Sequence, residues 1–317
     1  MSGTLNAARP SLVGRDFLRV NDWASEELQH VLDVAVELKT TGRNGSRDVL
    51  QGRALGMIFQ KPSTRTRVSF EVAMYQLGGH ALFLSAAELQ LGRGETVKDT
   101  GRVLSRYLDA IMIRTFKQSD VDELAAFADV PVINGLTDDF HPCQALADLL
   151  TVKERLGTTD DVTIAYFGDG NNVLHSLMVA AAKLGANVVA AVPEGYDPDA
   201  TVLAWARDAA AANGREVRIV RDPREAAAGA DVLYTDVWTS MGQEAQNERR
   251  LKDLADYQLN GELVGHASKD AIVLHCLPAH YGEEITEDLL YSSKSAVWDQ
   301  AENRLHAQKA LLALTIR

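Results

Sequence analysis

One stretch decides the fold of this chain: Lys61-Pro62-Ser63-Thr64-Arg65-Thr66-Arg67, where a buried strand turns into a helix. The apolar run 54–59 predicts the strand, and helical spacing over 68–77, ended by two glycines, predicts the helix. A helix N-terminus offers backbone N–H groups and a positive dipole end to an anion. Three cations and three hydroxyls beside it predict a site for a small phosphorylated ligand. The simpler alternative is a solvent-facing helix cap.

Outward from this turn, short apolar runs alternate with helical patterns through most of the chain. Such alternation predicts parallel sheets with helices on both faces. The candidate strands are 53–59, 80–84, 110–114, 131–133, 162–167, 187–192, 217–220, 231–235, 271–275 and 296–298. The predicted fold class is therefore α/β, with two doubly wound parallel-sheet domains.

A length of 317 residues favours two domains over a single core. The helical pattern over 143–156, which ends at a glycine, predicts the interdomain connector. We expect a first domain at 1–150, a second at 151–298, and a C-terminal helix within 299–317 that packs back on the first domain. Because open parallel sheets bind ligands at the carboxyl ends of their strands, we expect the active site in the cleft between the domains.

Composition excludes several classes of partner. With 32 basic and 44 acidic residues the net charge is −12, which argues against nucleic acid and anionic membranes. No apolar run approaches the roughly 20 residues of a membrane span, and the first residues lack the pattern of a secretory signal. Two cysteines cannot build a disulfide framework. We therefore expect a cytoplasmic protein with reduced thiols and no metal site of Cys/His spacing.

Polar residues follow the candidate strands of the first half. Arg114 ends the strand at 110–114, where a buried cation is costly unless it meets an anion or a carbonyl oxygen. A salt bridge to an Asp is the alternative. His141 and Gln144, in the tetrapeptide His141-Pro142-Cys143-Gln144, can lie on one side of a first helical turn. Taken alone, a loop histidine is more often structural.

Two polar segments of the second half also follow strands. Gly168-Asp169-Gly170-Asn171-Asn172 could be a dinucleotide turn, but Val173 breaks the Gly-x-Gly-x-x-Gly pattern. Asn172 is then expected to be a helix cap. Asp236 at a strand end can hold an ammonium group, while Ser240 and the Met241 backbone can address a carboxylate. The alternative is an Asp that caps a loop.

A cysteine closes the last clear strand, in His275-Cys276-Leu277-Pro278. A cysteine in this place is usually a small buried apolar residue. A thiol nucleophile would need a base, and His275 should point to the opposite side if the strand continues.

Together these motifs resemble the aspartate/ornithine carbamoyltransferase family, in matching order from about residue 53 to residue 304. Ser-Thr-Arg-Thr-Arg at 63–67 resembles its phosphate-binding signature, and the tetrapeptide at 141–144 resembles its carbamoyl-recognition motif. The tetrapeptide at 275–278 is similar to its His-Cys-Leu-Pro motif. Ser-Met-Gly at 240–242 resembles the loop of the members that act on ornithine.

The resemblance implies roles for individual residues. The catalytic residues are expected to be Arg114, His141, Asp236 and Cys276. Carbamoyl phosphate is expected to contact Ser63, Thr64, Arg65, Thr66, Gln90, Arg114, His141, Pro142, Cys143, Gln144, Cys276, Leu277 and Arg304. Ornithine is expected to contact Asn172, Asp236, Ser240 and Met241. Gln90 lies in a Gly-flanked loop that resembles the family's mobile loop, which completes a neighbouring subunit's site.

The implied activity is carbamoyl transfer from carbamoyl phosphate to the side-chain amine of L-ornithine, giving L-citrulline and phosphate. The resemblance implies no metal or organic cofactor, and a homotrimer or a multiple of trimers. Two alternatives stay open at this point. One is a carbamoyltransferase for another amine, such as putrescine or an N-acylated ornithine. The other is a non-catalytic carbamoyl-phosphate-binding protein.

Overall fold

The computed structural model describes residues 11–42, 45–87, 89, 94–239 and 247–316. The chain divides into two compact units: unit 1 is Met1–Asp138 with Arg304–Arg317, and unit 2 is Asp139–Asn303. Each unit contains one parallel sheet, of four and five strands respectively, so the predicted α/β class with two parallel-sheet domains is confirmed. The predicted domain limits at 150 and 298 stay predictions.

The sheet of unit 1 has the strand order β2-β1-β3-β4, and every pair is parallel. Its strands are β1 (Ala54–Phe59), β2 (His80–Ser85), β3 (Ala110–Arg114) and β4 (Val132–Leu136). The two central strands are almost entirely buried, which explains their continuous apolar runs. Phe59 pairs with Arg114 at the carboxyl ends of β1 and β3, beside the entry to the cationic stretch.

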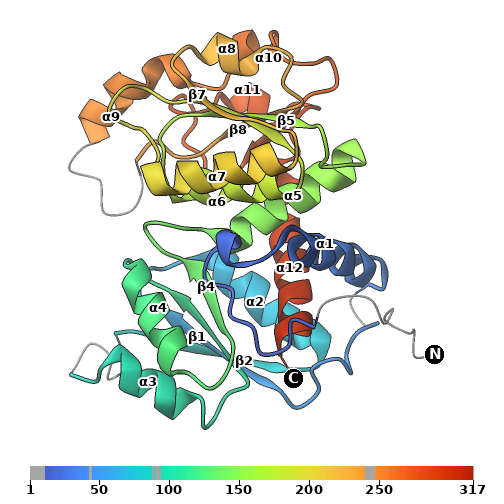
Figure 1. Ribbon diagram of the computed structural model, residues 1–317, viewed down its shortest axis with the longest axis vertical. Coiled ribbons are helices and arrows are strands. Elements are labelled where there is room, and N and C mark those ends of the chain that lie inside the picture. Colours follow the sequence, from blue (N-terminus) through green and yellow to red (C-terminus); the bar gives the residue numbers. More distant parts are fainter. Residues whose placement is uncertain (1–10, 43–44, 88, 90–93, 240–246, 317) are drawn as a thin grey trace. The chain divides into compact units, whose positions relative to one another are not determined.

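Helices surround this sheet (Figure 1). They are η1 (Val20–Asp22), α1 (Ser25–Thr40), α2 (Thr64–Leu77), α3 (Val97–Leu104) and α4 (Gln118–Phe127). Helix α2 follows β1 after four residues and ends at Gly78, whose φ of 86° lies in the left-handed region. A Cβ at Gly78 would come within 1.7 Å of the Arg47 carbonyl oxygen, so only glycine fits this helix end.

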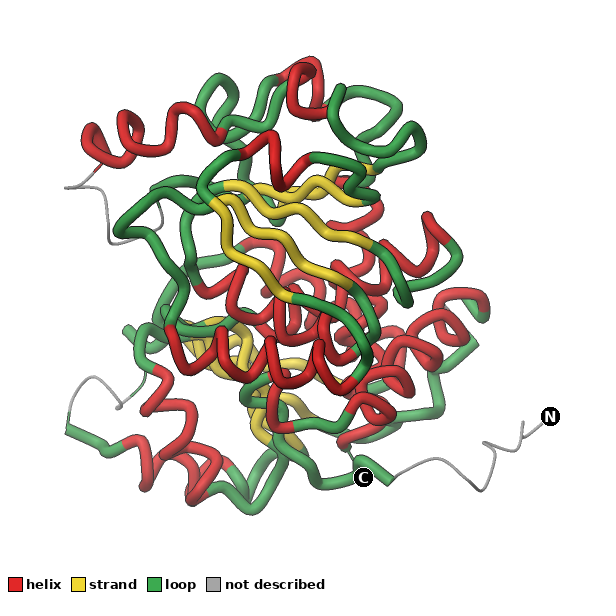
Figure 2. Tube along the Cα trace, turned by 45° about the horizontal axis from the view of Figure 1, so that its top comes forward, coloured by secondary structure: helices red, strands yellow, loops and turns green. Residues whose placement is uncertain are grey.

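The sheet of unit 2 has the order β7-β6-β5-β8-β9, again with all pairs parallel, and its strands lie side by side in Figure 2. They are β5 (Thr163–Phe167), β6 (Asn187–Ala191), β7 (Val217–Val220), β8 (Val232–Thr235) and β9 (Ile272–His275). Thr235 pairs with Phe167 on one side and with His275 on the other. Three strands therefore end at the same level, where the polar motifs begin.

Unit 2 is covered by helices on both faces of its sheet, and α6 and α7 lie side by side on one of them (Figure 1). The helices are α5 (Pro142–Leu156), α6 (Asn172–Lys183), α7 (Ala200–Ala212), α8 (Pro223–Ala227), α9 (Asn247–Leu254), η4 (Ala255–Tyr257), α10 (Gly261–Val264) and α11 (Glu287–Leu290). The last helix, α12 (Val297–Thr315), belongs to unit 2 up to Asn303 and to unit 1 from Arg304.

The predicted strand at 296–298 is wrong. Apart from its pairing with β8, β9 forms one isolated bridge within the described part of the chain, between Val273 and Ser295, and α12 begins at Val297. Three apolar residues are too few to show whether the pattern has the period of a strand or of a helix. A C-terminal helix is present, but it begins at Val297, two residues before the predicted range 299–317.

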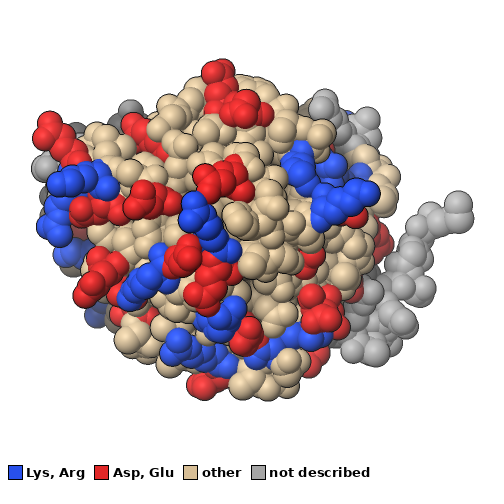
Figure 3. Space-filling model, turned by 90° about the horizontal axis from the view of Figure 1, so that it is seen from above, with Lys and Arg blue, Asp and Glu red and all other residues tan. Residues whose placement is uncertain are grey.

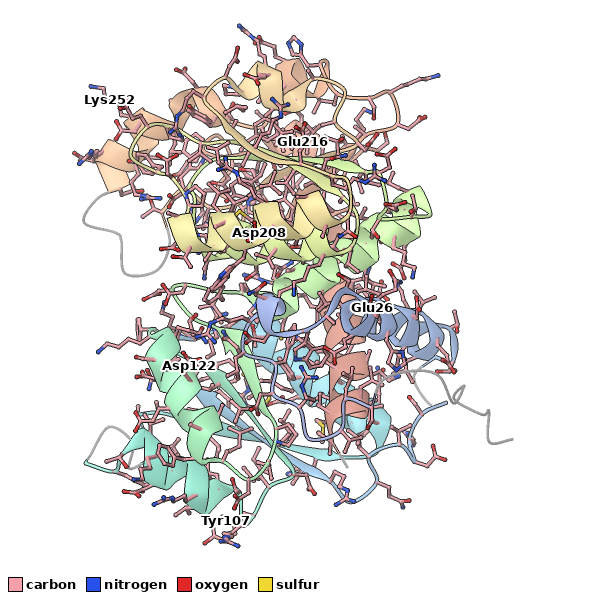
Figure 4. The ribbon with its side chains drawn as sticks, viewed as in Figure 1. Glu26, Tyr107, Asp122, Asp208, Glu216 and Lys252 are labelled. Atoms are coloured by element: carbon pink, nitrogen blue, oxygen red, sulfur yellow. The ribbon has the colours of Figure 1, made fainter. Side chains whose placement is uncertain are left out.

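Among the described residues, none of the helices is long and apolar enough to cross a membrane. On the face shown in Figure 3, Lys and Arg side chains lie among Asp and Glu rather than in one basic field. Exposed ion pairs of unit 2 have the same mixed character: Arg218 pairs with Glu216 and Glu225, and Arg224 with Glu262. Exposed pairs of this kind add little to stability, so unit 2 depends on its buried core.

Candidate functional site

The start of α2 in unit 1 is capped by its own hydroxyls. Ser63 is the N-cap residue, and its Oγ accepts a hydrogen bond from the Thr66 N–H at 3.2 Å. The same Oγ donates to the Thr66 Oγ1 at 3.1 Å. The first turn of α2 contains no acidic residue. The helix start therefore keeps its positive end, as an anion site requires.

The three cations of the stretch 61–67 are used differently. Lys61 is buried, forms an ion pair with Asp138, and places its Nζ 4.4 Å from the centre of the Phe116 ring. Arg67 pairs with Glu71 at 3.0 Å. Arg65, half-buried in the first turn of α2, makes no ion pair with any described residue. Of the three, Arg65 is the cation best placed to serve a ligand.

Two further arginines of unit 1 belong to this region. Arg304 of α12 is buried, and one of its guanidinium nitrogens donates to the Thr66 Oγ1 at 3.2 Å. Arg114 is buried at the end of β3, and its carbonyl oxygen accepts from the Gln60 N–H at 2.8 Å, just before the cationic stretch. The structure thus brings Ser63, Thr66 and Arg304 together directly.

In unit 2, three strand-end motifs meet at one buried carboxylate, that of Asp236. Its Oδ1 accepts from the Cys276 thiol at 2.7 Å and from the Val237 N–H at 2.8 Å. Its Oδ2 accepts from the Asn171 amide at 2.8 Å. The motifs after β5, β8 and β9 therefore form one cluster. A carboxylate with these three donors still has lone pairs for a ligand ammonium group.

The cap of α6 is Asn171 rather than Asn172, so the expectation for Asn172 is corrected. The Asn171 Oδ1 accepts from the N–H groups of Val173 and Leu174 at 3.0 and 3.1 Å. Asn172 is the first residue of the helix. Sequence reasoning missed Asn171 because two adjacent Asn residues are equally good caps by type. The contact of Asn171 with Asp236 depends on a strand 65 residues away.

The glycine at position 170 is required by packing, so the glycine-rich turn needs no bound dinucleotide to explain it. The Gly170 N–H donates to the Tyr196 carbonyl oxygen at 2.8 Å. A Cβ at Gly170 would lie 2.3 Å from the Pro198 nitrogen and 2.5 Å from that carbonyl oxygen. The glycine is therefore needed for close approach of two backbone segments of unit 2.

Two buried tyrosines lie beneath this cluster. Burial, followed by the nearby Asp236 carboxylate, raises the pKa of Tyr166 well above its usual range. Burial and then Asp148 do the same to the pKa of Tyr234. Both phenols therefore stay protonated at neutral pH and cannot act as bases. The Tyr166 hydroxyl donates to the Asn171 Oδ1 at 3.4 Å.

Both ring nitrogens of His275 bond to groups other than the Cys276 thiol. Its Nδ1 accepts from the Leu277 N–H at 2.8 Å, so its Nε2 carries the proton and donates to the buried Glu284 carboxylate at 3.0 Å. The thiol is bonded to Asp236 instead. Asp236, His275 and Cys276 do place three possible metal-ligand atoms within 4.8 Å of one another. Because both ring nitrogens of His275 already have partners, hydrogen bonding explains this cluster better.

The predicted carbamoyl-recognition tetrapeptide opens α5. His141 is the N-cap residue, and its N–H donates to the Ser176 Oγ at 2.8 Å. Cys143 is fully buried. The Gln144 amide donates to Asp148 Oδ1 at 2.8 Å, one turn along the helix. His141 and Gln144 thus lie within one turn of α5, as the sequence predicted.

Some predicted site residues remain without a structural account. Gln90, Ser240 and Met241 lie outside the described residues. Thr64 is exposed in the first turn of α2, and Leu277 is half-buried after β9 with a φ of 58°. The roles assigned to all of these residues stay predictions.

Two family models match the chain. The model "Aspartate/ornithine carbamoyltransferase, carbamoyl-P binding domain" matches residues 15–154, and the "Asp/Orn binding domain" of the same family matches residues 160–315. The chain is 57% identical over 307 residues to the "Ornithine carbamoyltransferase, anabolic" of Pyrococcus furiosus, covering 96% of this chain and 98% of the relative.

Solved structures give the same result. The ornithine carbamoyltransferase from Pyrococcus furiosus superposes with a TM-score of 0.94 at 57% identity, covering 97% of this chain and 98% of that one. The enzyme of that name from Gloeobacter violaceus gives 0.87 at 48% identity, covering 96% and 99%. Both units of the chain are thus accounted for by one family. The chain belongs to the aspartate/ornithine carbamoyltransferase family.

Proposed function

We propose that this enzyme transfers the carbamoyl group of carbamoyl phosphate to the side-chain amine of L-ornithine, giving L-citrulline and phosphate, a step of arginine biosynthesis. The observation that carries the proposal is the convergence of Asn171 and Cys276 on Asp236. It occurs in a chain that is 57% identical over nearly its whole length to a named ornithine carbamoyltransferase. A buried carboxylate lined by neutral donors suits an amino-acid ammonium group.

The phosphate of carbamoyl phosphate is held at the start of α2. Ser63, Thr64 and Thr66 supply hydroxyls, and Arg65 supplies a planar fork that matches phosphate. Arg304 reaches the same turn through Thr66 and addresses the carbamoyl end. The backbone N–H groups of the first helical turn complete this cradle.

The carbonyl group must be polarised before the amine attacks. Arg114 and His141 stabilise the oxygen of the tetrahedral intermediate, and Gln144 orients the carbamoyl NH₂. Preorganised donors of this kind are typically worth about 3–4 kcal/mol each. The charges come from arginines and a helix start, so the proposed chemistry requires neither a metal nor an organic cofactor.

The amine must be neutral to attack. With a lysine-like pKa of about 10.4, only about 0.1% of the ornithine side chain is neutral near pH 7.4. Asp236 alone would favour the charged form, so we assign it, with Asn172, Ser240 and Met241, to the α-amino acid end. Since the Cys276 thiol donates to Asp236, its sulfur can accept from the attacking nitrogen. The new C–N bond forms in the tetrahedral intermediate. When this intermediate collapses, the C–O bond to phosphate breaks and the departing phosphate takes the proton from the nitrogen.

The functional assembly is proposed to be a homotrimer, or a multiple of trimers, in the cytoplasm. In support, edge strand β2 of unit 1 exposes Leu82 and Phe83, each at 37%. An exposed apolar edge strand favours association with a further chain. Both cysteines are free thiols, in keeping with a reducing compartment. Sedimentation of the intact protein tests the assembly.

A citrulline-formation assay with carbamoyl phosphate and three amines tests the activity. At equal concentrations, L-ornithine should be carbamoylated faster than putrescine or N-acetylornithine by orders of magnitude, because each competitor leaves buried polar groups unpaired. Equal or better turnover of a competitor favours a carbamoyltransferase for another amine. Carbamoyl phosphate binding without any carbamoylated product favours the non-catalytic alternative.

A further inference from the structure

Asp148 is a fully buried carboxylate that none of the roles above uses. It lies on α5, one turn after Gln144. Its Oδ1 accepts from the Gln144 Nε2 at 2.8 Å and from the Gln300 Nε2 at 2.7 Å. Keeping a carboxylate in this surrounding is costly unless its hydrogen bonds are well made. The two amides that donate to one oxygen therefore offset part of the cost of burying the Asp148 carboxylate.

The first of these bonds fixes which way the Gln144 amide faces. An amide has donors at one end and an acceptor at the other, and an acceptor oxygen selects the NH₂ end. With its NH₂ on Asp148, Gln144 directs its carbonyl oxygen away from Asp148. A carbonyl oxygen is the group that can accept from the NH₂ of a carbamoyl group.

The second bond, from Gln300, connects Asp148 to the turn after β9. The Gln300 Nε2 also lies 3.2 Å from the Tyr234 hydroxyl, and the Gln300 Oε1 accepts from the His275 N–H at 2.8 Å. If the Gln300 amide were rotated by 180°, both its bond to Asp148 and its bond to the His275 N–H would be lost. The main chain that leads into Cys276 is thus tied to Asp148 through one side chain.

We propose that Asp148 is a positioning residue: it sets the Gln144 amide to receive the carbamoyl NH₂ and, through Gln300, holds the turn that carries Cys276. This inference rests on the proposed function, because it uses the role given there to Gln144. It extends that function to substrate selection. The enzyme distinguishes a carbamoyl group from an acyl group without an NH₂ by means of a carboxylate that never touches the substrate.

The test compares three phosphorylated or phosphate ligands in Asp148→Leu. Carbamoyl phosphate offers an NH₂ to Gln144, whereas acetyl phosphate and inorganic phosphate do not. The carbamoyl phosphate KM should rise by about tenfold or more, as expected when a buried hydrogen bond is lost. The inhibition constants of acetyl phosphate and inorganic phosphate should change by less than about twofold, because their contacts do not involve the Gln144 oxygen.

Two variants control the comparison. Asp148→Asn matches leucine in charge and approximate size but keeps an acceptor oxygen, so its carbamoyl phosphate KM should lie between wild type and Asp148→Leu. Thr151→Val removes a buried hydroxyl from the same helix, bonded to the Ala147 carbonyl at 2.7 Å and to Asn303 at 3.0 Å. It should leave all three constants near wild type.

The inference would be overturned if Asp148→Leu weakened the binding of all three ligands to the same extent, or if Thr151→Val raised the carbamoyl phosphate KM as much as Asp148→Leu does. Asp148 would then be a purely structural residue. An unchanged carbamoyl phosphate KM in a folded Asp148→Leu protein would also overturn the inference. If that protein does not fold, Asp148→Ser replaces it with the same expected split, because a serine hydroxyl is too short to reach both amides. Citrulline formation by the wild type separates this failure from a failure of the proposed function.

Discussion

The anion site of unit 1 and the amino-acid site of unit 2 are built in different ways. At the start of α2, Ser63 and Thr66 cap the helix from within one turn of sequence. At the strand ends of unit 2, Asn171 reaches Asp236 across 65 residues and Cys276 reaches it across 40. The first site is a local property of a strand-turn-helix segment. The second exists only once a five-stranded sheet has formed.

The two sites also differ in charge, in line with the two ligands proposed for them. The start of α2 presents donors and cations and has no acidic residue in its first turn. The cluster of unit 2 is centred on the Asp236 carboxylate, with Asp169 near enough to interact with it electrostatically. A leaving phosphate needs the former, and an amino-acid ammonium group needs the latter.

The largest expected effect comes from Arg65→Leu, which should abolish turnover while leaving the fold intact. The side chain is half-buried and makes no ion pair with a described residue, so a ligand contact rather than a core contact is lost. Calorimetric affinity for carbamoyl phosphate should fall by at least about 1.5–3 kcal/mol, the range for a hydrogen bond to a charged group.

Arg67→Leu is the matched control for this experiment. Arg67 lies in the same turn but pairs with Glu71, and its guanidinium covers the Phe83 ring at 3.9 Å. The Arg67→Leu protein should therefore bind carbamoyl phosphate with an affinity close to that of the wild type. If Arg65→Leu binds carbamoyl phosphate as tightly as wild type, the anion site is not at the start of α2.

In unit 2, Cys276→Ala should lower kcat by about 10- to 100-fold and weaken ornithine, with carbamoyl phosphate affinity nearly kept. The removed sulfur is the proposed acceptor for the amine, worth roughly one or two hydrogen bonds. Cys276→Ser should lose less, because a hydroxyl still accepts. Steady-state kinetics and thermal melts measure both effects.

Cys143→Ser is the internal control, because Cys143 is fully buried on α5 and its thiol has no catalytic role in the proposed reaction. It should retain more activity than Cys276→Ser. Wild-type kcat and ornithine KM in a folded Cys276→Ala protein would make Cys276 a packing residue only.

The difference between the local site of unit 1 and the long-range site of unit 2 also explains how much the sequence could predict. The run 54–59, the turn 61–67 and Gly78 predicted β1 and α2 closely, because caps and periodicity are local signals. The sequence also predicted that Asp236 and Cys276 end strands. It could not show that Asn171 joins them, or that Arg304 bonds Thr66 across 238 residues, because such pairs depend on strand order and helix packing. The wrong strand at 296–298 has a related cause, since one bridge to Val273 does not make a strand.

A smaller effect, on stability, is expected for Gly170→Ala. The new Cβ would meet backbone atoms of Tyr196 and Pro198, which cannot move aside as a flexible side chain can. The free energy of unfolding should fall by about 1–3 kcal/mol, as for other overpacked sites. Gly261→Ala is the control, since nothing lies within 4 Å of its Cβ position. Equal stability of the two variants in urea would show that the turn before α6 is not tightly packed.

The smallest expected effect is a pH dependence that arises from His175 of α6. Its Nε2 accepts from the Asp199 N–H at 2.9 Å, so the proton lies on Nδ1, 2.9 Å from the Asp139 carbonyl oxygen. Burial lowers the pKa of His175 below 6.5, although Asp199, Asp139 and Asp169 oppose this. The folded protein therefore holds a neutral ring that the unfolded chain would protonate near pH 6.5. This contribution to the free energy of unfolding is complete above pH 6.5 and is lost as the pH falls toward the lower folded pKa.

Each unit of pKa difference corresponds to about 1.4 kcal/mol. His175→Gln should flatten the fall in stability between pH 7.5 and 5, measured by urea denaturation at each pH. The exposed His80 of β2, replaced by Gln, is the control and should leave that slope unchanged. A His175→Gln protein that loses stability with acid as steeply as the wild type would assign the acid sensitivity to other groups. The contacts of α6 with the segments at Asp139 and Asp199 would then not depend on the protonation of His175.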